Sequence, residues 1–220
     1  MNLSLVAFLR QHVLSFLIIL CSPTAFLPGC DVQGRASPRV AKVIDGDTVR
    51  LVSGETLRYL GLDSPERDAP GYREALAANH ELVAGQTLEI QTFEKSSDRF
   101  GRLLGIVYRP EAGGETRRCV NRELLALGHG WVYQKNPDSF PEKLKKSFLD
   151  AQSEAIRERR GLWANVDFSS PPAGKLLSTR LRIHRIGCPG LRSARASPVS
   201  SLEKELQRGK SPCRKCAPLL

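Results

Sequence analysis

The sequence predicts a mainly β protein with helices (α+β): a five-stranded Greek-key barrel of the OB type with three packed helices, plus a small C-terminal module. Three observations support this prediction. Apolar residues alternate with polar ones from Pro38 to Leu62, helical spacing then interrupts the strands once, and two helical segments follow the last strand. Five strands with a helix between the third and the fourth are typical of this barrel.

Turn signals and changes in hydrophobic period separate the expected elements. DGD at 45–47 bends the first strand into the second, and SG at 53–54 is typical of a hairpin turn. Gly85 ends the first helical segment. The expected strands lie at 40–44, 49–51, 57–62, 87–93 and 102–110, and the expected helices at 71–85, 120–128 and about 141–160.

The positive charge of the chain is concentrated in its tail. The net charge is +10 over 220 residues. Residues 38–174 carry 20 Lys and Arg against 20 Asp and Glu, whereas residues 175–220 carry 11 Lys and Arg against Glu203 and Glu205. Overall basicity is therefore no evidence for what the central domain binds, although the tail itself suits an anionic partner.

Residues 1–30 are expected to be a signal peptide, because an apolar run from Val13 to Leu20 follows a basic residue and precedes small residues. The run is too short for a transmembrane helix. LPGC, ending at Cys30, resembles a bacterial lipoprotein cleavage box; the alternative is a soluble protein cut near Ala25. We expect an exported bacterial protein that is periplasmic, secreted or anchored to the membrane through Cys30. The other expected boundaries are a linker at 31–37, the barrel domain at 38–168, a linker at 169–179 and the module at 180–220.

Candidate catalytic residues gather where the expected strands end. Carboxylate oxygens suit a hard cation such as Ca²⁺, two arginines fit a phosphate, and a further carboxylate could orient or deprotonate a water. Each residue alone also has an ordinary interpretation as part of a turn, a loop or the solvent-facing side of a strand. Together they are the parts of a metal-assisted attack on a phosphodiester: Asp47, Arg58, Asp63, Ser64, Glu66 and Arg102.

The segments that carry these residues resemble the thermonuclease family, the staphylococcal-nuclease-like Ca²⁺ nucleases with an OB fold. The similarity runs through VIDGDTVRL (43–51), LRYLGLDSPE (57–66), SDRFGRLLGIVY (97–108) and VNRELLALGHGWVY (120–133), and it ends at RRGLW (159–163). It covers about 125 residues in the order typical of the family.

The resemblance implies a role for each matched residue. Asp47 and Asp63 would be Ca²⁺ ligands, and Ser64 would offer its backbone carbonyl. Arg58 and Arg102 would hold the phosphate and stabilise the charge of the transition state. Glu66 would be the general base, and Tyr133 would contact the nucleotide. The implied reaction is the hydrolysis of single-stranded DNA, RNA or both, leaving 3′-phosphate and 5′-hydroxyl ends.

The alternative is a catalytically inactive OB-fold module that binds nucleic acid or protein. We favour the enzyme, because a module that only binds has no need for two Asp, one Glu and two Arg at these positions. The expected partners are DNA, RNA or both, and the expected oligomeric state is a monomer.

The tail contains a separate candidate site, H-x3-C followed after 24 residues by C-x2-C. Four such ligands in two pairs can form a closed tetrahedral Zn²⁺ site: His184, Cys188, Cys213 and Cys216. The pattern resembles small modules appended to bacterial nucleases of the same family. A disulfide is the alternative in an exported protein. The basic module would be a second contact to a nucleic-acid backbone, or to anionic lipid if the chain is lipidated.

Overall fold

A computed structural model of the chain describes residues 38–93, 96–111, 116–134, 141–168, 175–191 and 195–219. The segment from Ala36 to Leu220 forms one compact unit. The expected signal peptide and first linker, including Cys30, lie outside the described residues. No helix in the described part of the chain is long and apolar enough to cross a membrane.

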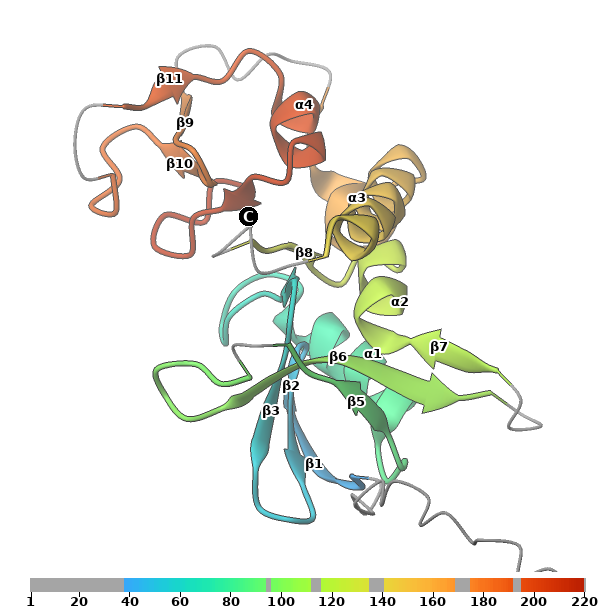
Figure 1. Ribbon diagram of the computed structural model, residues 1–220. Coiled ribbons are helices and arrows are strands. Elements are labelled where there is room, and N and C mark those ends of the chain that lie inside the picture. Colours follow the sequence, from blue (N-terminus) through green and yellow to red (C-terminus); the bar gives the residue numbers. More distant parts are fainter. Residues whose placement is uncertain are drawn as a thin grey trace, which may run out of the picture. The chain divides into compact units, whose positions relative to one another are not determined.

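Five strands form the barrel, and they pair in the order β1-β2-β3-β6-β5 (Figure 1). They are β1 (Val40–Asp45), β2 (Thr48–Leu51), β3 (Thr56–Tyr59), β5 (Glu89–Gln91) and β6 (Leu103–Pro110). The β3–β6 pair is parallel and the other neighbours are antiparallel. The mixed α+β architecture confirms the predicted fold class.

Backbone hydrogen bonds join the two ends of this sheet. The amide of Val40 donates to the carbonyl of Gln86 at 2.9 Å, and the amide of Leu88 donates to the carbonyl of Pro38 at 2.9 Å. These bonds place the start of β1 beside the segment that leads into β5, so the sheet closes on itself. Closure pairs the edge strands, which would otherwise leave backbone polar groups unpaired.

Three short strands were not expected from the sequence. β7 (Arg117–Cys119) extends the hairpin of β6, and β4 (Leu62–Asp63) pairs with β8 (Trp131–Val132). The third expected strand is therefore interrupted after Tyr59 by a turn in which Gly61 adopts a φ of 78°. A two-residue strand such as β4 is defined by its pairing with a strand far away in the sequence, and hydrophobic periodicity does not predict such a pairing.

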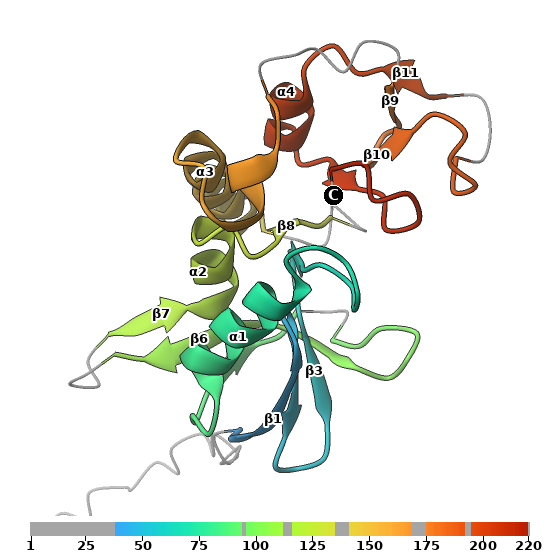
Figure 2. The same ribbon diagram turned by 180° about the vertical axis from the view of Figure 1, so that it is seen from behind.

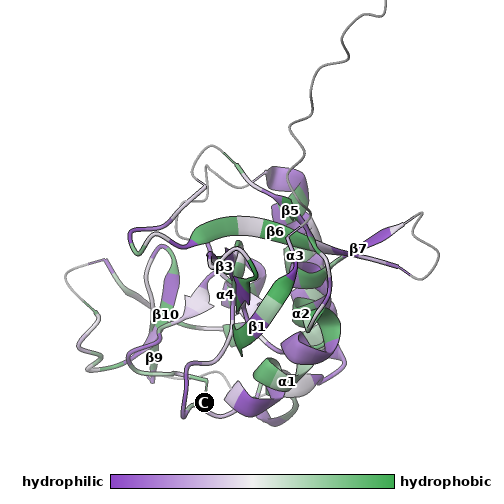
Figure 3. Cartoon of the chain, turned by 90° about the horizontal axis from the view of Figure 1, so that it is seen from below, coloured by the Kyte–Doolittle hydropathy of each residue, from purple (hydrophilic) through white to green (hydrophobic). Residues whose placement is uncertain are grey.

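Three helices of the barrel domain follow the prediction: α1 (Tyr72–Val83), α2 (Val120–Ala126) and α3 (Glu142–Arg157). Figure 2 shows α1 lying against the strands, and it packs on β1. The buried apolar residues of the strands and helices form one core, and Figure 3 shows how hydrophobic the middle of β6 is and how hydrophilic β7 is. Leu57, Ile106, Leu124 and Phe148 are all fully buried in this core.

The C-terminal segment forms a second, smaller sheet with the strand order β11-β9-β10-β12. Its elements are β9 (Leu176–Ser178), β10 (Arg182–Arg185), β11 (Ser197–Pro198), α4 (Leu202–Gln207) and β12 (Ser211–Pro212). β9 starts inside the segment 169–179 that we expected to be a linker.

The C-terminal segment shares an apolar cluster with the end of the barrel domain. Ile156 and Trp163, which lies in the 3₁₀ helix η2 (Gly161–Asn165), belong to the same cluster as Ile183 and Leu206. The buried side chain of Gln152 in α3 adds one polar link, since it donates to the carbonyl of Leu206 at 3.2 Å while it accepts from the amide of β8 residue Val132 at 2.8 Å. The module is thus packed onto the barrel domain.

Candidate active site and candidate metal centre

The turn between β1 and β2 carries Asp47, whose side chain is buried and oriented by hydrogen bonds. The Thr48 hydroxyl donates to its Oδ1 at 2.9 Å, and the amide of Ser64 donates to its Oδ2 at 2.7 Å. Gly46 permits this arrangement, because a Cβ there would lie 2.7 Å from the Cβ atoms of both Ala75 and Ser64. The contact that the structure shows for Ser64 is through its amide, so the ligand role of its carbonyl stays a prediction.

Asp63, at the end of β4, is fully buried and accepts hydrogen bonds on both oxygens. Nη2 of Arg58 donates to Oδ1 at 2.5 Å, and the indole nitrogen of Trp131 donates to Oδ2 at 3.2 Å. Arg214 adds its Nε at 3.0 Å from Oδ2 and its Nη2 to Oδ1. Asp63 thus receives hydrogen bonds from two guanidinium groups and from one indole nitrogen, and bonds between charged groups are the stronger kind.

Arg58 links the two buried aspartates. It projects from β3, is only 6% exposed, and ion-pairs with Asp47 through Nη1 and with Asp63 through Nη2. Burial lowers the pKa of Arg58 below its usual value, and the charge of Asp63 opposes that effect. The structure therefore brings together three of the residues predicted from the sequence, one from the turn between β1 and β2, one from β3 and one from β4.

Asp45 is a carboxylate of the same turn that the sequence analysis did not select. Burial raises the pKa of Asp45, against the opposing charges of Arg58 and Arg102. Its carbonyl accepts from Nδ2 of the buried Asn79 in α1 at 2.8 Å, which fixes the turn to the helix. The DGD motif at 45–47 was available as a signal, but it was interpreted as a turn.

Arg102 lies apart from the buried carboxylates, at the start of β6. Its Nε donates to Oδ2 of Asp98 at 2.8 Å, and its amide donates to Oδ1 of the same residue. The guanidinium also lies 5.5 Å from the centre of the Phe100 ring. Arg102 still acts electrostatically on Arg58, whose pKa its positive charge lowers in addition to the larger effect of burial.

Glu66 and Tyr133 lie at more open positions. The Glu66 side chain is 55% exposed and ion-pairs with Nη1 of Arg214. The Tyr133 ring is covered on one face by the guanidinium of Arg182, which lies 4.5 Å from the ring centre. The sequence analysis missed Arg214 and Trp131, because no spacing rule connects either residue with Asp63.

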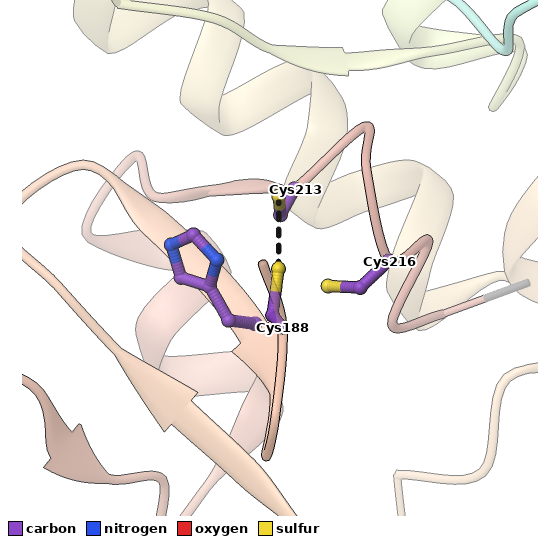
Figure 4. Close-up of side chains that lie close together, drawn as sticks. Cys188, Cys213 and Cys216 are labelled. Atoms are coloured by element: carbon purple, nitrogen blue, oxygen red, sulfur yellow. Dashed lines mark hydrogen bonds between the residues drawn. The ribbon is translucent and has the colours of Figure 1, made fainter. Parts of the chain in front are cut away.

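The four tail residues predicted as zinc ligands lie together. One ligand atom from each of His184, Cys188, Cys213 and Cys216 lies within 4.8 Å of the others. The sulfurs of Cys188 and Cys213 are 3.8 Å apart, and Figure 4 shows the three cysteine side chains facing one another from two chain segments. In a tetrahedral site with Zn–S bonds of about 2.3 Å, two sulfurs would lie about 3.8 Å apart. A disulfide would require a separation of about 2 Å.

Two further observations fit a metal in this cluster. Nδ1 of His184 is buried and has no hydrogen-bond partner in the described part of the chain. Backbone amides donate to two of the sulfurs at 3.3 Å, from Arg185 to Cys216 and from Gly190 to Cys188. Burial, the largest single effect, opposes ionisation of Cys188, but hydrogen bonds from the Gly190 amide, Cys216 and Cys213 together hold the pKa of this thiol below its usual value.

The barrel thus holds two buried aspartates bridged by an arginine. Comparison with known proteins identifies the class of protein. Residues 56–165, half of the 220 residues, match the family model described as staphylococcal nuclease homologue. The chain belongs to this family and is a nuclease.

Relatives of the chain include proteins that are named as nucleases. The chain is 33% identical to an uncharacterized endonuclease of Escherichia coli O157:H7, over 62% of this chain and 80% of that protein. It is 31% identical to a micrococcal nuclease of Shigella flexneri, over 60% of this chain and 76% of that protein. It is also 31% identical to Protein ParB of Escherichia coli, over 62% of this chain and 81% of that protein. The resemblance and the enzyme class expected from the sequence are confirmed.

Proposed function

We propose that the protein is a Ca²⁺-dependent endonuclease that hydrolyses single-stranded DNA, RNA or both and leaves 3′-phosphate and 5′-hydroxyl ends. The observation that carries this proposal is the pair of buried aspartates, Asp47 and Asp63, bridged by Arg58 in a nuclease fold. Burial of carboxylates is costly unless positive charge accompanies them. Arginine supplies part of this positive charge. The carboxylate oxygens of the site suit a bound cation, which would supply the remainder.

The donor set fits Ca²⁺ rather than a softer metal. Asp45, Asp47 and Asp63 offer only carboxylate oxygens, which are the ligands that Ca²⁺ prefers. Asp47 and Asp63 would hold the ion, and the Ser64 carbonyl would be a third ligand. Ca²⁺ supplies positive charge that polarises the phosphoryl group and favours hydroxide formation.

The arginines and Glu66 would act on the substrate. Arg58 lies between the two aspartates, so its guanidinium is already oriented to take up negative charge that develops on the phosphoryl oxygens. Arg102 would bind the phosphate by exchanging its pairing with Asp98 for phosphate oxygens. Glu66 is exposed enough to reach a water and to accept its proton.

Digestion assays with and without a chelator test this function. We expect the purified protein to cleave single-stranded DNA or RNA with Ca²⁺ and to stop when the ion is chelated. Cleaved 5′ ends should accept a phosphate from a polynucleotide kinase without prior phosphatase treatment. Cleavage that persists after chelation would refute the metal dependence, and 5′-phosphate products would refute the proposed polarity.

We also propose that His184, Cys188, Cys213 and Cys216 hold a structural Zn²⁺. The support is the sulfur spacing of 3.8 Å together with the buried, unpartnered Nδ1 of His184. Metal analysis of the purified protein should find stoichiometric zinc. Cys188→Ser should lose the metal, whereas Cys119→Ser should keep it, because Cys119 lies outside the cluster. Zinc-free protein with oxidised cysteines would contradict the proposal.

The cellular location is proposed from the sequence alone. An apolar run and a lipoprotein-like box at Cys30 support an exported protein that is periplasmic, secreted or anchored to the membrane. Fractionation of cells that express the full chain and a Cys30→Ser variant tests this. Movement of the variant from the membrane to the soluble fraction would support lipidation, and retention of the full chain in the cytoplasm would contradict export.

A further inference from the structure

Arg214 reaches the nuclease site from the far end of the chain. It lies between Cys213 and Cys216, 151 positions after Asp63 in the sequence. Its Nε lies 3.0 Å from Oδ2 of Asp63, and its Nη2 contacts Oδ1. Its remaining nitrogen, Nη1, ion-pairs with Glu66. All three guanidinium nitrogens are therefore engaged by two residues of the candidate active site.

The backbone that carries Arg214 is anchored on both sides. The amide of Cys213 donates to the carbonyl of Ile183 in β10 at 2.8 Å, and the amide of Ala217 donates to the carbonyl of Cys213 at 2.9 Å. The preceding strand, β12, contacts β8, which in turn pairs with the strand that holds Asp63. The contact is thus built by the fold of the module, and a bidentate guanidinium–carboxylate pair is geometrically specific.

The same pairing is incompatible with a metal ion on Asp63. Arg214 and Arg58 together engage both oxygens of this carboxylate, which are the atoms that Ca²⁺ would use. Arg58 is held in place, because it is 8% exposed at its side chain and also pairs with Asp47. The Arg214 side chain is 41% exposed, so it is the guanidinium that can leave.

The charges of the site indicate where Arg214 goes. Within the set of side chains that Arg58 and Arg214 pair directly, three carboxylates face two guanidinium groups, so the net charge without a metal is −1: Asp47, Asp63 and Glu66 against Arg58 and Arg214. A divalent cation would reverse the sign of this balance and make the site attractive to an anion. A displaced Arg214 would stay near the carboxylates because its backbone is anchored, and its planar guanidinium can donate two hydrogen bonds to a phosphate.

We propose that Arg214 is a substrate-binding residue of the nuclease site that pairs with Asp63 and Glu66 in the metal-free protein and with the substrate phosphate once Ca²⁺ occupies the carboxylates. This inference rests on the proposed Ca²⁺-dependent function. It makes the C-terminal module part of the active site, because the Cys213–Cys216 turn delivers the side chain.

The test compares Arg214→Ala with the wild type in two binding measurements. Calorimetric titration with Ca²⁺ alone should show about fivefold tighter binding by the variant, because its internal competitor is gone. Fluorescence anisotropy with a phosphorothioate single-stranded oligonucleotide in Ca²⁺ should show about tenfold weaker binding by the variant. The slope of log K against log salt should also become shallower by about 1, since one phosphate contact is lost.

Matched variants separate this role from a general loss of charge or of folding. Lys215→Ala removes the same charge one residue away and should leave the Ca²⁺ affinity unchanged. Arg214→Lys keeps the charge without the planar fork, so it should change both affinities in the same directions by smaller factors, and it remains available if Arg214→Ala does not fold. Wild-type Ca²⁺ and oligonucleotide affinities in a folded Arg214→Ala would show that the residue is only a structural ion pair.

The outcomes distinguish this inference from the function on which it rests. The proposal requires that Arg214→Ala changes both affinities. Tighter Ca²⁺ binding without weaker oligonucleotide binding, or weaker oligonucleotide binding without tighter Ca²⁺ binding, would show that Arg214 does not move from the carboxylates to the phosphate. If the wild type cleaves with Ca²⁺ and the Arg214→Ala variant matches it in both affinities, the proposed role of Arg214 is wrong and the proposed function stands. A wild type without Ca²⁺-dependent cleavage would overturn the proposed function, and the role of Arg214 with it.

Discussion

Of the two arginines proposed to bind the phosphate, Arg102 is the one whose removal tests the chemistry with least disturbance of the fold. Its side chain is about one-third exposed and pairs with Asp98 in the same loop. Arg58 is different, because its loss would leave two buried carboxylates without their common partner, which is strongly destabilising. A kinetic effect of an Arg58 variant would therefore combine lost catalysis with lost stability.

We predict that Arg102→Ala lowers kcat by about 10²–10³-fold with little change in melting temperature, because one stabilising charge at the phosphate is lost. Steady-state kinetics with single-stranded DNA, together with a thermal melt, measure both quantities. Arg50→Ala is the matched control, since Arg50 is an exposed arginine of β2. Turnover close to that of the wild type in Arg102→Ala would exclude this residue from the mechanism.

The sequence predicts that residues at the ends of neighbouring strands lie close together. Asp47, Arg58 and Asp63 are in contact, whereas Arg102 pairs with Asp98, and the catalytic roles of all four stay predictions. The sequence analysis did not identify the Trp131 hydrogen bond to Asp63. That bond depends on the pairing of β4 with β8, two strands too short to produce a hydrophobic pattern.

At the scale of single elements, α4 contains one buried carboxylate, that of Glu205. Glu205 is 7% exposed and pairs with Arg208 through Oε1 at 2.6 Å and with Lys210 through Oε2 at 2.5 Å. Burial alone would raise the pKa of Glu205, but the hydrogen bonds of Lys210, Ser178 and Arg208 and the charge of Lys210 together hold the pKa below its usual value. The charged form of Glu205 therefore stabilises the folded state.

The sign of this pKa shift gives a pH dependence. A carboxyl whose pKa is lower in the folded than in the unfolded protein stabilises the fold at pH values above the unfolded pKa of 4.5, and the effect is lost as the pH falls through the folded pKa. We predict that Glu205→Gln reduces the free energy of unfolding by about 1–2 kcal/mol at pH 7. The difference from the wild type should shrink below about pH 4.5.

Chemical denaturation at several pH values measures this difference. Glu203→Gln on the same helix is the control, because its carboxylate is exposed and its described side-chain contact is a hydrogen bond from Gln207. A constant difference between wild type and Glu205→Gln from pH 7 to pH 3 would show that the effect is not linked to ionisation of Glu205.

At the scale of the whole molecule, the barrel domain and the C-terminal module share an apolar cluster. Ile156 is 4% exposed and Trp163 is 1% exposed, and both belong to the cluster that contains Ile183 and Leu206. The sequence predicted a linker at 169–179 between the two parts. The structure adds that the parts are packed against each other through this cluster and through Gln152.

We predict that ending the chain after Phe168 lowers the melting temperature by roughly 5 °C or more and promotes association, because the apolar face of α3 and η2 becomes exposed. Calorimetry and light scattering measure the two effects. Ile186→Ala in the full chain is the control, since this residue of the module is 58% exposed. An unchanged melting temperature for the shortened chain would mean that the module adds nothing to the stability of the barrel domain.

Strand periodicity, turn residues and motif order are local properties, so they were enough to predict the barrel, its three helices and the resemblance to the family. The residue types of both candidate sites limit which ligands could bind there. The contact of Arg214 with Asp63 and the core that the module shares with α3 became visible in the tertiary structure. Contacts between residues 151 positions apart depend on how the whole chain packs, which no local pattern encodes.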